Sequence, residues 1–405
     1  MKIIIQILFL LVLMGLQSCN FLFGNKKDTT VDEVFEQGKI DPALVPQNVG
    51  YVPIFPFFSG FQHPVDIYVG YDNMIYVCDD NGLHILDLTG KEHRRIAING
   101  ATDVIQDRKM QTYVCGRAEV IRSGQTYNLA AVYKIINSAT SSGYIIVDTL
   151  LHPDCDLSRS GFRGALDEQV SFTGLAATAD NTLYISRTGP LNELDKAYRT
   201  DNCILFFDPN GNNIGSATGL NPISGGLKSC AGISSMASFC APPQLIFGMN
   251  SSRDFLVTLN NQGINLEYRV LWIREIIDTD NGNSYLQNDQ MLNFDTTKAN
   301  DFLYRPFRFS SPTDIFIAPD KSGYIFVVDD VSDSLYQFTQ AGFEGVNAPA
   351  NSTSRKQIIA SFGGNGNGPF QFDQPSGVCF FKRMLYVADK GNNRICRFKL
   401  NTDIE

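Results

Sequence analysis

Residues 362–400, FGGNGNGPFQFDQPSGVCFFKRMLYVADKGNNRICRFKL, are the most regular part of the chain, and most of the rest consists of weaker copies of them. A glycine-rich approach ends at Pro375. Three short apolar runs follow, at 377–381, 384–388 and 394–400, separated by polar turns. Short apolar runs divided by Gly, Asn and Asp are typical of antiparallel strands joined by tight turns.

The amino-acid sequence of this stretch resembles the NHL repeat at two places, P-S-G-V at 375–378 and L-Y-V-A-D-K-G-N-N-R-I at 385–395. The resemblance implies that each repeat is one four-stranded blade of a β-propeller. A single blade has two apolar faces that it cannot cover alone, so blades must stack radially until the ring closes.

Six strand openings align with the final repeat, and each is followed by a second and a third apolar run. We therefore expect an all-β fold, a six-bladed β-propeller of four-stranded antiparallel blades over residues 49–405. The openings are Pro64-Val65-Asp66-Ile67, Ala101-Thr102-Asp103-Val104, Phe172-Thr173-Gly174-Leu175, Pro243-Gln244-Leu245-Ile246, Pro312-Thr313-Asp314-Ile315 and Pro375-Ser376-Gly377-Val378.

The sixth repeat ends after three strands. An apolar extended stretch at 51–55, YVPIF, lies near the other end of the propeller sequence. We expect it to supply the missing strand, because a closed ring leaves no open sheet edge.

The N-terminus predicts an exported, anchored protein. Lys2 precedes an apolar run at 3–16 that is shorter than the roughly 20 residues of a membrane-spanning helix. Leu16-Gln17-Ser18-Cys19 then resembles a bacterial lipobox, with Gln17 departing from the usual pattern. This implies a signal peptide at 1–18, lipidation of Cys19 and anchoring to the outer membrane, with the periplasmic or cell-surface side left open. An ordinary secretory signal is the alternative. Residues 19–48 are polar and are expected to form a flexible tether.

The net charge of −9 argues against nucleic acid as a partner, because phosphate binding needs a basic surface. Nothing resembles a phosphate-binding glycine loop. Triplets such as Asp28-Thr29-Thr30 and Asp295-Thr296-Thr297 resemble the O-glycosylation motif of Bacteroidota, a short pattern that also arises by chance.

Most of the long insertions belong to one face of the predicted ring, the face where chains enter the first strands and where second and third strands connect. They are 116–129, 152–170, 187–202, 220–242 and 295–310, whereas 341–355 belongs to the opposite face. Loops held by a rigid scaffold are frequent binding surfaces, and neutral insertion is the alternative. The candidate contacts on this face are Arg159, Phe162, Arg163, Arg187, Tyr198 and Arg199.

Asp66, Asp103 and Asp314 recur at one position in three blades, near the channel mouth. The favoured interpretation is that each Asp accepts hydrogen bonds from backbone N–H groups of the adjoining loop. A Ca²⁺ ion held by their oxygens is the alternative, and no other cofactor is expected. The four histidines, His63, His84, His93 and His152, are not placed to converge on a zinc ion.

Four of the nine cysteines, Cys155, Cys203, Cys230 and Cys240, fall in or beside the long loops and are disulfide candidates in an exported protein. A 230–240 bridge would close a small loop, and a 155–203 bridge would fix the 152–170 insertion over the channel. Unbridged thiols are the alternative.

These observations favour a non-enzymatic binding or scaffolding propeller whose partner is an envelope protein or a polysaccharide. The competing hypothesis is a metal-dependent hydrolase or lyase of the six-bladed class that uses the channel carboxylates.

Overall fold

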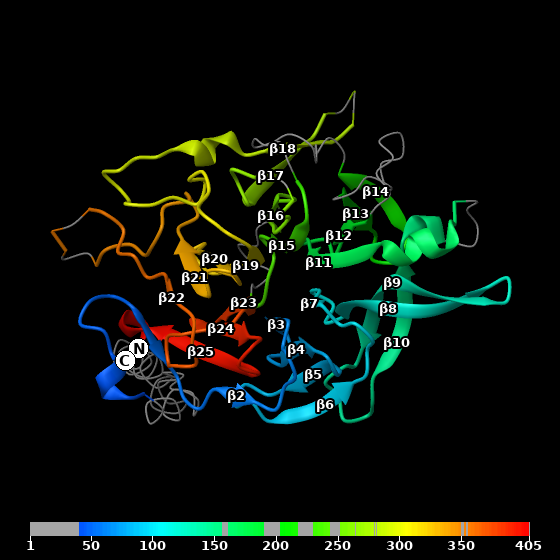
Figure 1. The fold of residues 1–405 in the computed structure, drawn as a ribbon, viewed down its shortest axis with the longest axis horizontal. Helices are drawn as coiled ribbons and strands as arrows, with labels where there is room; N and C mark the ends of the chain where they lie inside the picture. The colour runs from blue at the N-terminus through cyan, green and yellow to red at the C-terminus, as the bar shows by residue number, and fades with distance from the viewer. Residues whose placement is uncertain are drawn as a thin grey trace, which may run out of the picture.

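A computed structural model of the 405-residue chain describes residues 40–155, 161–189, 203–217, 230–243, 252–263, 265–278, 280, 282–349, 352–353 and 355–404. In these residues the strands form six antiparallel sheets arranged radially around a central axis (Figure 1). The predicted six-bladed propeller is confirmed.

Within each blade the strands run from the axis outward in chain order. The first five blades are β3 Asp66–Val69, β4 Ile75–Asp79, β5 Gly82–Leu86 and β6 Glu92–Ile96; β7 Asp103–Gln106, β8 Thr112–Arg122, β9 Gln125–Ile136 and β10 Ile145–Leu151; β11 Ser171–Ala177, β12 Leu183–Thr188, β13 Cys203–Phe207 and β14 Asn213–Ala217; β15 Ile233–Ser238, β16 Phe255–Leu259, β17 Val270–Ile276 and β18 Ser284–Gln287; and β19 Pro312–Ile317, β20 Ile325–Asp329, β21 Ser334–Phe338 and β22 Phe362–Gly363.

The sixth blade closes the ring as predicted. Its chain-terminal strands are β23 Pro375–Phe381, β24 Met384–Asp389 and β25 Arg394–Leu400, and the outer strand is the N-terminal β1 Tyr51–Pro53. Tyr51 pairs with Leu400 and Pro53 with Phe398, while β2 Phe58–Ser59 adds a further pairing to β25. The first and the last strand of the described residues therefore share one sheet (Figure 1).

Short 3₁₀ helices lie in the connections: η1 Pro42–Leu44, η2 Pro153–Cys155, η3 Gly164–Gln169, η5 Asp289–Leu292 and η6 Asn401–Asp403. None of the helices in the described residues has the length and hydropathy needed to cross a membrane.

Two sequence predictions of blade structure were wrong. The fourth blade opens at β15 Ile233–Ser238 and not at Pro243, so the 220–242 segment contains a central strand rather than being wholly a loop. The 116–129 insertion is a β-ribbon, because β8 and β9 stay paired from Thr112↔Ile135 out to Arg122↔Gln125. This ribbon projects from the disc beside the third blade (Figure 1).

The two faces of the ring are named here by their connections. The loop face carries the entries into the innermost strands and the connections between second and third strands. The turn face carries the connections between first and second strands, such as Lys382-Arg383, and also both described chain ends, because β1 and β25 are antiparallel.

Candidate functional site

A cavity of about 430 Å³ opens on the loop face at the channel mouth. Every blade contributes one residue at the same position to its lining, immediately before the position of the recurring aspartates. These residues are Val65, Thr102, Thr173, Ser234, Thr313 and Ser376. Five of the six carry a hydroxyl group, Val65 being the exception, and we call the set the hydroxyl ring.

Four members of the hydroxyl ring are β-bulge residues. The strand register shifts across Phe172/Gly174, Ile233/Ser235, Pro312/Asp314 and Pro375/Gly377, which leaves the residue between each pair outside the regular pairing. A bulge redirects its side chain, here toward the next blade.

Each of these four hydroxyls donates a hydrogen bond to a backbone carbonyl of the following blade. Thr173 Oγ1 lies 2.6 Å from the Ile233 carbonyl oxygen, Ser234 Oγ 2.7 Å from that of Pro312, Thr313 Oγ1 2.9 Å from that of Pro375, and Ser376 Oγ 2.7 Å from that of Pro64. The last of these bonds joins the sixth blade to the first. The mouth is therefore a rigid rim of hydroxyls and carbonyls.

One residue deeper, the corresponding positions of the six blades hold Asp66, Asp103, Gly174, Ser235, Asp314 and Gly377. The four of these that carry side chains line a cavity in the channel. Asp66 Oδ2 accepts the Val104 backbone N–H at 2.8 Å, and Asp314 Oδ2 accepts that of Val378 at 2.6 Å. Asp103 likewise accepts the Leu175 N–H. The sequence favoured backbone N–H groups of the adjoining loop as the partners of the three aspartates, and the structure instead supplies N–H groups of the next blade.

The two glycines of this layer are there because neighbouring backbones approach too closely for a side chain. A Cβ at Gly377 would lie 2.7 Å from Asp66 Cα, and one at Gly174 would lie 2.9 Å from the Met236 nitrogen. Backbone atoms cannot give way as the end of a side chain can, so these positions exclude larger residues.

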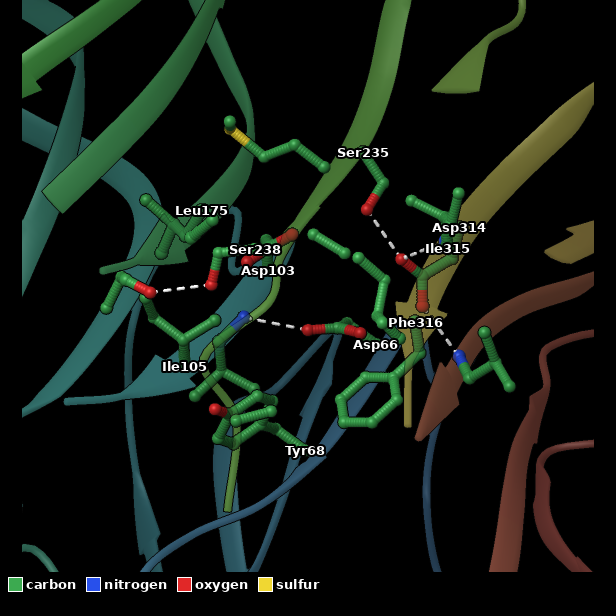
Figure 2. Close-up of a pocket in the computed structure, with 18 of the residues that line it drawn as sticks. Asp66, Tyr68, Asp103, Ile105, Leu175, Ser235, Ser238, Asp314, Ile315 and Phe316 are labelled. Carbon is green, nitrogen blue, oxygen red and sulfur yellow. Dashed lines mark hydrogen bonds between the residues drawn. The ribbon is translucent and has the colours of Figure 1, made fainter. Parts of the chain in front are cut away.

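The aspartates enclose a cavity of about 40 Å³, enough for about three water molecules. Figure 2 shows Asp66, Asp103 and Asp314 around it, with Tyr68, Ile105 and Phe316 packed alongside. The three aspartates are 6–8% exposed, so a ligand in the mouth meets the hydroxyl ring and not the carboxyl groups.

Burial also controls the ionisation of these groups. It raises the pKa of Asp66 and Asp103 well above the ordinary range, and repulsion from neighbouring carboxyl groups acts in the same direction. Burial raises the pKa of Asp314 to about 6, against hydrogen bonds from Ser235, Val378 and Ile315. The cluster is thus poised to hold protons more tightly than free carboxylates do.

A different set of side chains has metal-ligand spacing. In the described part of the chain, the group of three or more His, Cys, Asp or Glu side chains whose ligand atoms all lie within 4.8 Å of one another is His152, Asp154 and Asp167, all buried. His152 Nδ1 accepts the Asp154 backbone N–H at 3.3 Å. An imidazole and two carboxylates are ligands that divalent transition ions accept. The sequence reasoning missed this group because it considered His152 only together with the other histidines.

The structure places the predicted contact residues in different environments, and some of them lie outside the described part of the chain. Arg159, Tyr198 and Arg199 lie outside the described residues. Phe162 packs edge-on against Tyr127 of the β-ribbon, with ring centroids 5.0 Å apart, and its ring faces Arg122.

The remaining two predicted contacts are Arg163 and Arg187. The Arg163 backbone N–H donates to Asp167 at the start of η3. Arg187 was expected on the binding surface, but it is fully buried in β12, so this prediction was wrong.

The cysteines of the described residues are all buried, and the structure forms no disulfide between them. Cys230 and Cys240 flank β15, whose six residues span about 20 Å at the usual rise per residue. A disulfide needs Cα atoms within about 7 Å, so the geometry contradicts a 230–240 bridge. Cys240 lies 3.7 Å from the Tyr71 hydroxyl on the turn face, not on the loop face. The 155–203 bridge stays a prediction.

Comparison with protein-family models finds no match, and comparison with curated protein sequences finds none either. The NHL resemblance of 375–395 therefore stays a prediction.

Solved structures of similar shape include a streptogramin B lyase, with 12% identity, a TM-score of 0.43, and coverage of 87% of this chain and 98% of the other. Others are an auxiliary nutrient binding protein from Bacteroides ovatus, with 10% identity, a TM-score of 0.48, and coverage of 87% and 77%, and a Bacteroides thetaiotaomicron protein of unknown function, with 12% identity, a TM-score of 0.49, and coverage of 89% and 74%. Likenesses this remote assign no activity to this chain.

Proposed function

We propose that this chain is an envelope lipoprotein whose propeller binds an envelope polysaccharide or protein at the mouth of the loop face, without chemical conversion of the partner. The observation that carries the proposal is the cavity of about 430 Å³ lined by the hydroxyl ring. Its volume falls in the range of roughly 300–1,000 Å³ that is usual for ligand pockets.

The chemistry of the mouth favours an uncharged, hydrogen-bonding partner. The hydroxyl ring offers hydroxyl lone pairs and backbone carbonyls, and the charged member of the cavity lining, Arg117, is occupied. The Arg117 guanidinium donates to the carbonyl oxygens of Val170, Asn128 and Glu168, which joins the β-ribbon to η3. Sugar hydroxyl groups complement such a surface better than an ion does.

The channel carboxyl groups favour binding over the alternative of a hydrolase, because they are already hydrogen-bonded and lie below the mouth. Asp66, Asp103 and Asp314 each accept a backbone N–H from the next blade and lie beneath the hydroxyl ring. A metal-dependent reaction at these groups would require the substrate to pass into a space for about three waters.

The topology also gives an orientation relative to the proposed anchor. The described N-terminal segment is bonded to the turn face: Asn401 Nδ2 donates to the Asn48 carbonyl oxygen, and Gly50 N donates to Asn401 Oδ1. If Cys19 is lipidated, the tether enters on the turn face. The mouth then points away from the anchored side.

The test is a blocking substitution in the mouth. The Thr102 side chain is exposed and, within the described residues, makes no hydrogen bond to the next blade, so Thr102→Trp fills the mouth without removing an inter-blade bond. Ser142→Trp, an exposed site on the turn face, is the matched control. Both forms and the parent would be titrated with purified envelope polysaccharide and used to capture proteins from detergent-solubilised membranes.

We expect binding of either the polysaccharide or one protein to be lost in Thr102→Trp and kept in Ser142→Trp. A partner that binds parent and Thr102→Trp equally would refute the placement of the site in the mouth.

A further inference from the structure

We infer a second binding site, on the turn face, for an organic acid that combines an anionic group with an apolar body. A cavity of about 710 Å³ lies there, beside the blade in which β1 pairs with β25. It is formed by segments distant in sequence: Val49 before β1, the β19–β20 connection, the β23–β24 turn, and the residues after β25. It shares no lining residue with the mouth of the loop face.

The walls of this cavity are mainly apolar. Tyr324, Phe380, Val346 and Leu400 contribute to them. A hollow of this size with apolar walls and a few polar groups is the usual form of a small-molecule site. The body of the ligand would therefore be aliphatic or aromatic.

The charged groups at the rim favour an anion. The lining holds Lys321, Lys382 and Arg383 against Asp320 and Asp403. Both carboxylates already have partners: Asp403 pairs with Arg383, and Asp320 accepts the Ser322 N–H at 2.9 Å.

The two lysines have no ion pair with a described carboxylate. Lys382 Nζ instead donates to the Asn73 side-chain oxygen at 3.2 Å and lies 5.3 Å from the Phe381 ring centre. A chain with a net charge of −9 thus presents an excess of positive charge at this cavity.

The turn that carries two of these cations is unusual. Phe381 pairs with Met384, so Lys382 and Arg383 are the two central residues of a tight hairpin, with φ of +47° and +65°. Such a turn favours Asn-Gly, because residues with longer side chains resist positive φ. Lys382 and Arg383 therefore occupy two turn positions where Asn and Gly would be less strained. Backbone strain of this kind is common at binding sites.

This conflict between turn preference and charge provides the test. Lys382→Asn/Arg383→Gly installs the preferred turn and removes both cations, so we expect it to fold at least as stably as the parent. Lys109→Asn removes an exposed lysine from another turn-face connection that does not line the cavity, and serves as the control.

The probes are 4-phenylbutyrate and 4-phenylbutanol, which share a body and differ in the charged group, titrated calorimetrically into the full-length chain. We expect the parent and Lys109→Asn to bind the acid about tenfold or more tightly than the alcohol, the factor that corresponds to one charge-assisted hydrogen bond. The Asn-Gly variant should lose that preference while its melting temperature stays equal or rises.

Equal binding of acid and alcohol by the parent, no binding of the acid, or undiminished binding by the Asn-Gly variant would each overturn the inference. The mouth of the loop face is untouched by these substitutions, so the outcome is independent of the Thr102→Trp experiment.

Discussion

Removing the N-terminal strand should open the propeller. The comparison uses two truncated chains, one beginning at Val49 and one beginning at Pro56. The first loses only residues before the sheet, of which the described ones are largely exposed. The second also loses β1 and Ile54, which pair with β25 in the last blade.

The expected difference follows from burial. Tyr51, Val52 and Ile54 are 3%, 0% and 0% exposed. Burying one such side chain stabilises a fold by about 1.5–3 kcal/mol, so their loss together costs about 5–9 kcal/mol. Tyr51 also donates its hydroxyl to Gln337 Oε1 at 2.8 Å, which ties the closing strand to the fifth blade. Whole domains are stable by only about 5–15 kcal/mol.

Thermal unfolding followed by circular dichroism measures the effect. The chain beginning at Val49 should melt close to the full-length protein. The chain beginning at Pro56 should show no cooperative transition, or one shifted far downward, and should aggregate through the exposed edge of β25. Equal melting temperatures for the two truncations would refute the closing role of β1.

Four further predictions concern the anchor, the channel and the cysteines. Cys19→Ala should move the protein from the membrane fraction to the soluble fraction, and membrane residence that persists in high salt would argue against lipidation. Asp103→Asn should be close to neutral at pH 7, since Asp103 Oδ1 has no hydrogen-bond partner. Asp314→Asn should cost about 1–3 kcal/mol in urea unfolding at pH 4, because both Asp314 oxygens accept hydrogen bonds and an amide nitrogen cannot accept them. The folded-state pKa of Asp314 is raised from 3.8 to about 6, so its contribution to stability is fully present below pH 3.8 and is lost as the pH rises through 6, by about 3 kcal/mol. The free energy of unfolding of the parent, relative to that of Asp314→Asn, should therefore fall between pH 4 and 7. A relative stability that rises over this range would contradict the sign. Peptide mapping of alkylated, unreduced protein should recover Cys230 and Cys240 as alkylated thiols. The same map tests the 155–203 bridge expected from the sequence, and recovery of Cys155 as an alkylated thiol would rule that bridge out.

The aspartates show how a site can be anticipated in part. Their recurrence as the third residue of three openings indicated a shared position, and a hydrogen-bonding role followed from the chemistry of a carboxylate beside backbone N–H groups. Sequence could not show that the acceptors face the next blade, or that the hydroxyl ring lies above them, because the β-bulges that turn Thr173, Ser234, Thr313 and Ser376 leave no mark in the residue pattern.

The first strand of the fourth blade could not be identified from the local sequence pattern. β15 has the sequence ISSMAS, whose small residues lack the alternation and the turn punctuation that identified the other openings. Its place at the axis comes from its neighbours: Ser234 donates to the Pro312 carbonyl oxygen and Ser235 to Asp314, both in the fifth blade.

By itself the sequence determined the architecture and its closure. Blade formation depends on short-range alternation and turn residues, and the missing sixth-blade strand could be matched to the apolar stretch at 51–55. The tertiary structure alone decided which surfaces can bind. The mouth collects one residue from each of six blades, and the turn-face cavity joins Val49 to Lys321, Lys382 and Asp403. Residues so far apart in the chain come together only when the ring closes, because contacts between blades depend on the radial packing and not on the repeat itself.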